Sequence, residues 1–522
     1  MEELGITIAG IFAGVFVLYA LLNIVSKSGG DKRKRQPPEA GGGLPVIGHL
    51  HLLNATKPIQ TTLAKMADTY GPIFTLKLGM NTTLIVSNWE IAKECFRTND
   101  TIFASRPKTA AGKLLGYDYA LMGTIPYGPL WRHVRKIVAL KLLSNHRLEQ
   151  LKHIRISEVQ SCIKNLYELW VNRSEEKLLV DMTMWFGDIS RNTIFRMVVG
   201  KRFSSAFDHS GNEEYRKAVS DFFELFGVFV PSDSFPFLKW FDLGGHEKAM
   251  KKTMKVLDQV LDKWIKECRQ KRDSDREVES VANDFMHVML SAVKDDDQFS
   301  IYDDDTITKA TCLALISGGS DTTSITMQWA LSLLLNNKDT LKKLQFELDE
   351  QIGRGRKVEE SDVKNLLYLQ AVVKETLRLY PAAPIGIPHE STENCIVANY
   401  HIPAKTQLIV NLQKLHRDPV IWEDPNEFKP ERFLMSQKNF DVRGQNPQLI
   451  PFGNGRRMCP GISFALQVMY VTLANLLHMF EVGRPSEELL DMEEGIGITC
   501  VRKNSLQIVL TPRLPSEVYE QF

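Results

Sequence analysis

The strongest chemical signal in the sequence is a single cysteine in a glycine-punctuated loop, Pro451–Gly461. Cys459 stands just before an apolar helical pattern, so we expect it close to a helix N-terminus, where free N–H groups and the positive dipole end favour a thiolate. Gly453, Gly455 and Gly461 remove side chains where something flat must approach the backbone. The alternative is a small buried cysteine, but the whole pattern should arise by chance in only about one chain in ten thousand.

A second candidate site interrupts a helical pattern that runs from about 306 to 335. Two adjacent glycines there each cost about 0.5 to 1 kcal/mol relative to alanine, and such a cost in mid-helix indicates a site. The hydroxyl of Thr322 can compete for the carbonyl of Gly318 one turn earlier, with the carboxyl of Asp321 beside it. Because Ala314, Gly318 and Thr322 are four residues apart, they share one stripe, which should floor a pocket.

Two residue pairs at helical spacing have weaker signals of their own. Trp131 and Arg135 lie on one helical face, an arrangement that is most often a core edge. Glu375 and Arg378 also face one way, and alone they would be a surface ion pair worth about 0.3 to 0.5 kcal/mol. A later Pro-Glu-Arg-Phe segment contains Arg432.

Taken in order, these segments resemble the cytochrome P-450 superfamily of haem-thiolate monooxygenases, from about Pro45 to Leu514. The resemblance implies heme b (iron protoporphyrin IX) with Cys459 as its axial thiolate, a ligand that favours O–O cleavage. It also implies further cofactor-binding residues, which are Trp131, Arg135, His389, Phe452, Arg457 and Gly461. Phe452 would pack beside the sulfur, and the basic and tryptophan side chains would contact the propionates.

The same resemblance assigns the remaining site residues. Asp321 and Thr322 would be the acid and alcohol over the iron, and Glu375, Arg378 and Arg432 a buried structural network. The substrate pocket would include residues from several segments, namely Tyr117, Tyr119, Leu121, Ala314, Gly318, Ile385 and Ile498. Aromatic and apolar residues in the turn-rich segment 103–128 are as often simple anchors of that segment.

Several details look like the plant microsomal branch, most like family 82. This implies hydroxylation of a lipophilic specialised metabolite with O2 and electrons from NADPH through NADPH-cytochrome P-450 reductase. A terpenoid or flavonoid is the expected substrate, with oxidation or N-demethylation of an alkaloid or coumarin as the alternative. A thiolate-haem isomerase or dehydratase would not need Asp321 and Thr322, and a non-catalytic haem or sterol binding protein would consume no NADPH.

The elements that must position these residues are mostly helical. The resemblance implies a mainly α (α+β) fold, the helical haem-thiolate fold with a small β-sheet region, and a pocket-lining strand at 382–388. Runs at 73–78 and 83–86 predict a strand hairpin. The aromatic, proline-rich stretches 226–231 and 234–241 predict an apolar flap that caps the pocket, dips into lipid or packs in the core.

The N-terminal part predicts a membrane anchor. Residues 5–25 carry no charge and are long enough to cross a hydrocarbon core of about 30 Å. Basic residues follow them, so the positive-inside rule places 1–4 in the lumen and the rest in the cytosol. A cleaved signal would carry its positive charge first. We expect a basic and Pro/Gly-rich linker at 26–45, a haem domain at 46–522, and a single-pass protein of the endoplasmic reticulum membrane.

The amino-acid composition limits the kinds of binding partner that we expect. The formal net charge of +1 gives no reason to expect nucleic acid. Seven scattered cysteines suggest neither a disulfide framework nor a zinc site, which indicates a reducing, cytosol-facing domain. Arg132, His133, Lys136 and Lys141 predict either a basic surface for an acidic electron donor or a plain solvated helix face.

Overall fold

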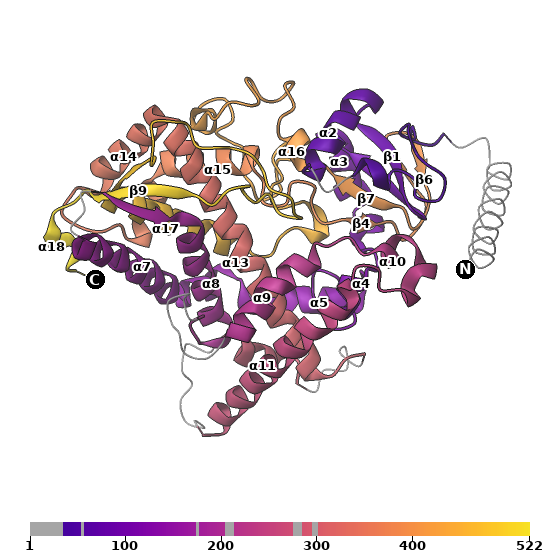
Figure 1. The fold of residues 1–522 in the computed structure, drawn as a ribbon, viewed down its shortest axis with the longest axis horizontal. Helices are drawn as coiled ribbons and strands as arrows, with labels where there is room; N and C mark the ends of the chain where they lie inside the picture. The colour runs from indigo at the N-terminus through magenta and orange to yellow at the C-terminus, as the bar shows by residue number, and fades with distance from the viewer. Residues whose placement is uncertain are drawn as a thin grey trace, which may run out of the picture.

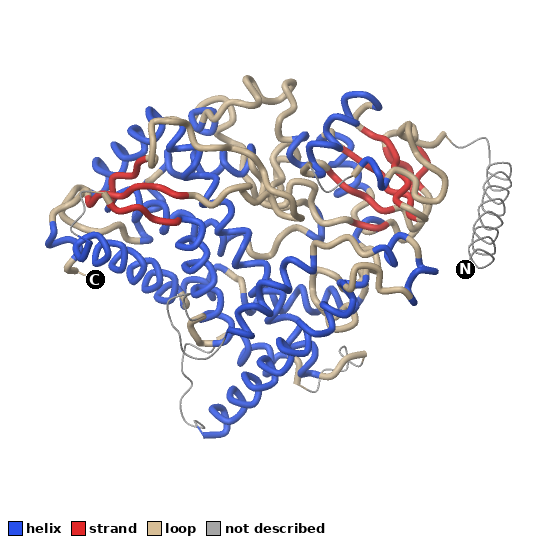
Figure 2. The backbone as a smooth tube through the Cα atoms, viewed as in Figure 1, coloured by secondary structure: helices blue, strands red, loops and turns tan. Residues whose placement is uncertain are grey.

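The computed structural model describes residues 35–53, 57–173, 177–203, 213–274, 284–294 and 301–521. The anchor expected at 5–25 lies outside the described residues. Figure 1 shows a roughly triangular outline, with β1 and α10 near one corner, α18 near the second, and α11 reaching toward the third. Helices dominate, and strands gather in two separate places (Figure 2).

Three small sheets make up the β part of the fold. The first has the order β1-β2-β7-β4, in which β2 and β7 are parallel and the other pairs antiparallel. The second has the order β3-β9-β8, and the third is the β5-β6 hairpin. The strands are β1 (Ile73–Leu78), β2 (Asn81–Val86), β3 (Leu178–Asp181), β4 (His389–Glu390), β5 (Cys395–Val397), β6 (Tyr400–Ile402), β7 (Gln407–Val410), β8 (Phe480–Gly483) and β9 (Gln507–Pro512).

Helices form the rest of the structure. They are α2 (Ile59–Tyr70), α3 (Trp89–Lys93), α4 (Ala110–Leu114), α5 (Pro129–Ile137), α6 (Asn145–Gln150), α7 (Lys152–Arg173), α8 (Met182–Val199), α9 (Glu213–Phe226), α10 (Pro231–Ser234), α11 (His246–Ser274), α12 (Phe285–Ala292), α13 (Asp304–Asn336), α14 (Lys338–Ile352), α15 (Leu367–Leu379), α16 (Leu412–Leu415), α17 (Ile462–Met479) and α18 (Ser516–Tyr519). Short tight helices used below are η3 (Ile102–Ala104), η5 (Pro236–Trp240), η8 (Pro430–Phe433) and η9 (Gly455–Arg457).

The long helix α13 is the centre of the core. The side chain of Asp303 caps its N-terminus by accepting from the Thr306 N–H. α13 packs against α8, α15 and α17, and most of its residues are buried, as expected of a helix enclosed by others. A Cβ on Gly319 would lie 3.0 Å from Ile194 Cγ1 and 3.2 Å from Phe464 Cε1, so this glycine allows α8 and α17 to approach α13 closely.

α17 is a core helix although its composition would also suit a membrane. Among the described residues it is the one helix long and apolar enough to cross a bilayer, and 83% of it is buried inside the protein. It begins at Ile462, directly after the cysteine loop, as the sequence predicts. The loop is therefore attached to the interior of the protein.

Two sequence expectations differ from the structure. Residues 382–388 form turns and not a strand, since Pro384 and Pro388 have no N–H to donate to a ladder and Gly386 has a φ of +62°. The end of the expected linker belongs to the fold, because Thr75 N donates to Pro38 O and Ala40 N donates to Thr75 O. Backbone pairing with β1 thus begins before residue 46.

Candidate active site

The cysteine loop is held in shape by its own backbone. Cys459 N donates to Phe452 O at 2.9 Å, and Gly453 N donates to Ile450 O at 2.9 Å. Gly455 has a φ of +69°, and a Cβ there would lie 2.5 Å from a carboxylate oxygen of Asp100. Only glycine fits such a position without strain. Of the seven cysteines Cys459 alone is partly exposed, and the other six are buried.

Burial and local donors act in opposite directions on the Cys459 thiol. Burial raises its pKa, while the Gly461 N–H, 3.3 Å from Sγ, and the charge of Arg135 lower it. The helix end therefore favours the thiolate as expected, but burial outweighs it. A bound metal ion would supply the missing positive charge, because a coordinating thiol is deprotonated outright.

Three arginines converge behind the loop. Burial, followed by the charges of Arg106 and Arg135, lowers the pKa of Arg457 to about 9, and burial lowers that of Arg106 to about 9. No ion pair links any of the three to a carboxylate within the described part of the chain. Arg106 Nε is buried without a hydrogen-bond partner. Arg106 is buried and Arg135 and Arg457 are half-buried, so these like charges need a counter-anion, which the two propionates of a haem would provide.

The other residues expected near the propionates lie around this cluster. The Arg457 guanidinium lies 4.3 Å from the ring centroid of Trp131, and it donates to the carbonyls of Ala104, Met122 and Ile125. Those carbonyls hold Arg457 against the segment that follows η3. Arg135 Nη2 donates to Met458 O at 2.6 Å, which ties α5 to the cysteine loop.

His389 is buried beside the arginines. Its Nδ1 lies 2.6 Å from the carbonyl of Phe103, so Nδ1 carries the proton. Burial, and then the charge of Arg106, holds the pKa of His389 well below its usual range. A neutral imidazole with Nε2 as acceptor fits a site already rich in cations.

The stripe on α13 is open in the middle of a buried helix. Ala314 and Thr322 are half-buried and Gly318 is exposed, with no atom within 4 Å of a Cβ placed on it. The Thr322 hydroxyl donates to Gly318 O at 2.8 Å, the competition expected from the sequence. Burial raises the pKa of the neighbouring Asp321, and the charge of Arg191 on α8 opposes this.

These observations fit a haem at this place. A partly exposed cysteine, three arginines that pair with no carboxylate among the described residues and a helix stripe that is open at Gly318 suit an iron porphyrin with two carboxylates. Ala314, Phe452 and Cys459 also pack against the same core cluster.

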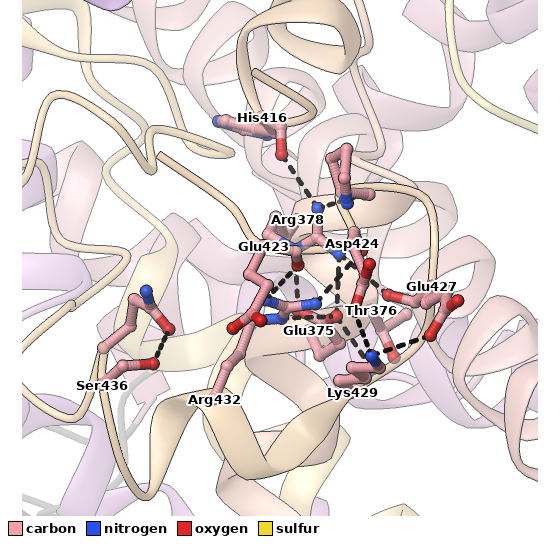
Figure 3. Close-up of polar contacts among 12 residues, drawn as sticks. Glu375, Thr376, Arg378, His416, Glu423, Asp424, Glu427, Lys429, Arg432 and Ser436 are labelled. Atoms are coloured by element: carbon pink, nitrogen blue, oxygen red, sulfur yellow. Dashed lines mark hydrogen bonds and ion pairs between the residues drawn. The ribbon is translucent and has the colours of Figure 1, made fainter. Parts of the chain in front are cut away.

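The predicted structural network is present and fully buried. Both carboxylate oxygens of Glu375 accept from Arg378, at 2.7 and 2.8 Å, and Oε1 also accepts from Arg432 Nε at 3.0 Å. Figure 3 shows the two guanidinium groups converging on this one carboxylate. Their remaining donors bind backbone carbonyls, which are those of His416, Glu423, Asp424, Pro425 and Glu427.

The network reaches the cysteine loop through one histidine. Arg378 Nη1 donates to His416 O at 2.9 Å, and His416 Nε2 accepts from Ile450 N at 2.9 Å, one residue before the loop. Burial, and then the charge of Arg378, lowers the pKa of His416 to about 3, so the ring stays neutral and able to accept. The buried ion pair therefore helps to position the loop that carries Cys459.

The expected pocket residues lie in different surroundings. Leu121 is buried, Ile385 packs against the β1-β2 side of the first sheet, and Ile498 contacts Gly227 after α9. Tyr117 donates from its hydroxyl to Asp258 on α11 at 2.8 Å, which anchors its segment. Tyr119 is half-buried.

Sequence reasoning missed three features of the site. Arg106 lies in the turn-rich segment 103–128, and nothing in the neighbouring sequence marks it as the third arginine of the cluster. His416 has no motif of its own. An apolar cavity between three helices was also missed, and it is lined by Val219, Phe222 and Phe223 of α9, Leu257 and Leu261 of α11, and Leu313, Ile316 and Ser317 of α13.

Comparison with known proteins agrees with this geometry. Residues 37–509 match the family model described as Cytochrome P-450. Strychnine-10-hydroxylase of Strychnos nux-vomica is 48% identical over 97% of this chain and 98% of its own length. Flavonoid-6-hydroxylase of Ocimum basilicum is 49% identical over 93% of each chain, and cytochrome P-450 82A1 of Pisum sativum 45% identical over 96% of this chain and 97% of its own.

A solved structure supports the fold. A zebra fish cytochrome P-450, whose structure contains progesterone, superposes with a TM-score of 0.71 at 25% identity. The match covers 87% of this chain and all of the other.

Proposed function

Because this chain belongs to the cytochrome P-450 family, and is a monooxygenase with a cysteine-ligated haem, we propose that Cys459 is the axial ligand and that Arg106, Arg135 and Arg457 face the propionates. The observation that carries this proposal is the cluster of one buried and two half-buried arginines, which has no carboxylate partner among the residues that the structure describes and lies beside the one partly exposed cysteine. Such a cluster is costly unless an anion compensates it.

The chain's own residues would then manage protons above the haem. Haem with a thiolate ligand supplies the activation of molecular oxygen. The Thr322 hydroxyl is bound through its proton to Gly318 O, which leaves its oxygen as an acceptor toward the open stripe. Asp321, with its raised pKa, holds a proton at higher pH than an ordinary carboxyl and can deliver it. Both groups have a role in oxygen chemistry without touching the substrate.

The substrate that we propose is an uncharged, lipophilic plant metabolite of the flavonoid or terpenoid class, hydroxylated at carbon. The expected pocket residues carry no charge, and the cavity beside α13 is lined by apolar side chains and one serine. An alkaloid is the alternative, since one similar protein is named as a hydroxylase of strychnine. The basic nitrogen of an alkaloid would need an anionic partner, for which the structure offers Asp321. The raised pKa of Asp321 means that this carboxyl is ionised less readily than an ordinary one.

The electron donor that we propose is NADPH-cytochrome P-450 reductase. Arg132, Lys136 and Lys141 are exposed on and after α5, the helix that also carries Trp131 and Arg135. An acidic partner attracted to this face would approach the haem from the side of the cysteine loop.

We also propose attachment to the endoplasmic reticulum membrane, with the catalytic domain in the cytosol. Residues 5–25 would form the anchor. The expected flap would make a second contact with the membrane, because its side chains Phe237, Trp240 and Phe241 are exposed by 60%, 92% and 65%. It lies at the same corner as β1 (Figure 1), and Met80 N donates to Ser234 O.

The ligand assignment is tested by carbon monoxide spectroscopy of the reduced protein. Wild type should show the thiolate-type band for which the family is named, and Cys459→His should shift it to that of imidazole-ligated haem. Cys162→Ser, a change at a buried cysteine, should leave the band unchanged. A native band in Cys459→His would assign the iron to another residue.

The substrate class is tested by a panel of flavones, terpenes and alkaloids. Binding is read as a spin-state shift, and turnover as product formed per NADPH in the presence of the reductase. Shifts with alkaloids alone would contradict the proposed class.

A further inference from the structure

Three different metal-binding side chains meet away from the site described above. Cys268 lies near the end of α11, Asp284 caps α12, and His287 lies in the first turn of α12. One ligand atom from each lies within 4.8 Å of the other two. Cys268 is 6% exposed, and Asp284 and His287 are half-buried, so the three groups share a largely enclosed space.

The carboxyl and the imidazole are already oriented toward each other. Asp284 Oδ1 accepts from the His287 backbone N–H at 3.0 Å and from Nδ1 at 2.8 Å. A Cβ on Gly200 would lie 3.1 Å from Asp284 Oδ2, so the backbone at the end of α8 limits how the carboxylate can turn. Binding at this site would therefore require little ordering of side chains.

We propose that Cys268, Asp284 and His287 form a Zn²⁺ site that joins α11 to α12. Thiolate, imidazole and carboxylate are the three donor types that zinc uses in proteins, and a thiolate in the set disfavours Mg²⁺ and Ca²⁺. With three protein ligands, water would complete the tetrahedral coordination.

The charges of the three proposed ligands suit a divalent cation. Zinc takes cysteine as the thiolate and histidine as the neutral imidazole, so two anionic ligands and one neutral ligand would surround the metal. Arg147 of α6 is close enough to feel the charge of Asp284, and the two anionic ligands would offset its charge beside the metal.

A second cysteine close by provides the matched control. Cys312 on α13 is completely buried, and after burial itself the charges of Asp284 and Cys268 raise its pKa further. It is therefore near the proposed site but is not one of the three ligands that converge. Its substitution changes the same core region without removing a proposed ligand.

The test is the zinc content of the full-length, haem-loaded protein in detergent. The protein is equilibrated with a zinc buffer and dialysed against a weak chelator, and zinc and iron are measured by elemental mass spectrometry. We expect about one zinc ion per haem, with one sulfur in the zinc shell by X-ray absorption at the zinc edge. The haem does not contribute to that edge.

Four variants make the result specific. Cys268→Ser and His287→Gln should lower the zinc affinity at least about tenfold. Asp284→Asn should do so too, although asparagine still caps α12. Cys312→Ser should retain zinc. The carbon monoxide band of the haem, which reports ligation by Cys459, should be unchanged in all four variants. This separates the zinc site from the haem.

Two results would overturn the proposal. One is a wild-type protein that retains no more zinc than Cys268→Ser. The other is an equal loss of zinc in Cys312→Ser, or a zinc shell with no sulfur, because either would show a different ligand set.

Discussion

Two neighbouring polar residues of α13, Asp321 and Thr322, lie in different surroundings. Thr322 lies on the open stripe with its proton engaged by Gly318 O, while Asp321 feels the charge of Arg191 on α8. We therefore expect the Asp321 carboxyl to supply protons and the Thr322 hydroxyl to hold the group that receives them. This division predicts different defects for the two side chains.

Thr322→Ala should keep the Cys459 ligation spectrum and substrate binding, yet divert a larger share of NADPH into hydrogen peroxide. Asp321→Asn should slow oxygen consumption, because it removes the proton donor and keeps the shape. Positioned proton transfer is typically worth about 100- to 10,000-fold in rate. Oxygen, NADPH and peroxide are measured together in one reconstituted assay.

A matched control is Thr326→Ala. Thr326 makes the same bond to the carbonyl four residues earlier, Thr322 O at 2.9 Å, but it is buried and away from the opening. It should leave coupling unchanged. Full rate and full coupling in Thr322→Ala would mean that protons arrive by another route.

His416 predicts sensitivity to acid. Its folded pKa of about 3 lies below the unfolded value of about 6.5, so its contribution to stability is complete above pH of about 6.5 and is lost as the pH falls from there toward 3. Within that window the unfolded chain binds one more proton, which costs about 1.4 kcal/mol per pH unit.

His416→Gln keeps an acceptor near the Ile450 N–H and cannot titrate, so it should flatten the acid dependence of thermal unfolding between pH 7 and 5 by up to about 1.4 kcal/mol per pH unit. His389, also held neutral by burial, should account for part of the remaining slope. His153→Gln, at an exposed position, is the comparison. An unchanged slope in His416→Gln would show that this ring is not the neutral acceptor.

At the scale of elements, α13 combines two adjacent glycines with opposite tasks. Gly319 faces Ile194 of α8 and Phe464 of α17, and Gly318 faces open space. A helix with alanine at both positions would be intrinsically more stable, so the two glycines serve packing on one side and an opening on the other.

Gly319→Ala should destabilise the fold, since overpacking typically costs about 1 to 3 kcal/mol and outweighs the gain in helix propensity. Gly318→Ala should raise stability by about 0.5 to 1 kcal/mol but weaken the spin-state response to substrate, because its methyl group fills the stripe. Thermal unfolding and substrate titration measure the two effects. Equal stability changes in the two variants would contradict the assignment of the two faces.

The buried network links elements that are far apart in sequence. Glu375 and Arg378 of α15, Arg432 of η8 and His416 after α16 form one polar unit whose last member binds the backbone of Ile450. Each guanidinium nitrogen of Arg378 and Arg432 donates to the Glu375 carboxylate or to a backbone carbonyl (Figure 3). Its role is to hold the cysteine loop at a fixed place relative to α15.

For the molecule as a whole, the apolar flap predicts how the protein meets a membrane. A form without residues 5–25 should keep its haem spectrum and still bind phospholipid vesicles through Phe237, Trp240 and Phe241. Replacing all three by serine should abolish that binding, because burying each large apolar side chain is worth about 1.5 to 3 kcal/mol. Vesicle sedimentation measures it.

The control for the flap is Leu489→Ser. Leu489 is 69% exposed but lies outside the flap, so its substitution should not change sedimentation with vesicles. Loss of haem on removal of residues 5–25 would show instead that the anchor contributes to the fold. Vesicle binding that survives the triple substitution would place the second contact elsewhere.

The sequence by itself determined the family, the helical fold class, the cysteine loop, the central helix and the β1-β2 hairpin. These features are local: glycines at fixed positions, helical and alternating periodicity, and a hydroxyl four residues from a carbonyl act over a few neighbouring residues. The expected strand at 382–388 failed for a local reason as well, because two prolines there outweigh its apolar character.

Only the tertiary structure decided which distant residues share a site. Arg106 meets Arg457, Tyr117 turns to Asp258, and Cys268 meets Asp284 and His287 across a helix boundary. The periodicity of the sequence does not predict these contacts. They depend on how α8, α11, α12 and α13 pack and on which buried charges that packing leaves without a counter-ion.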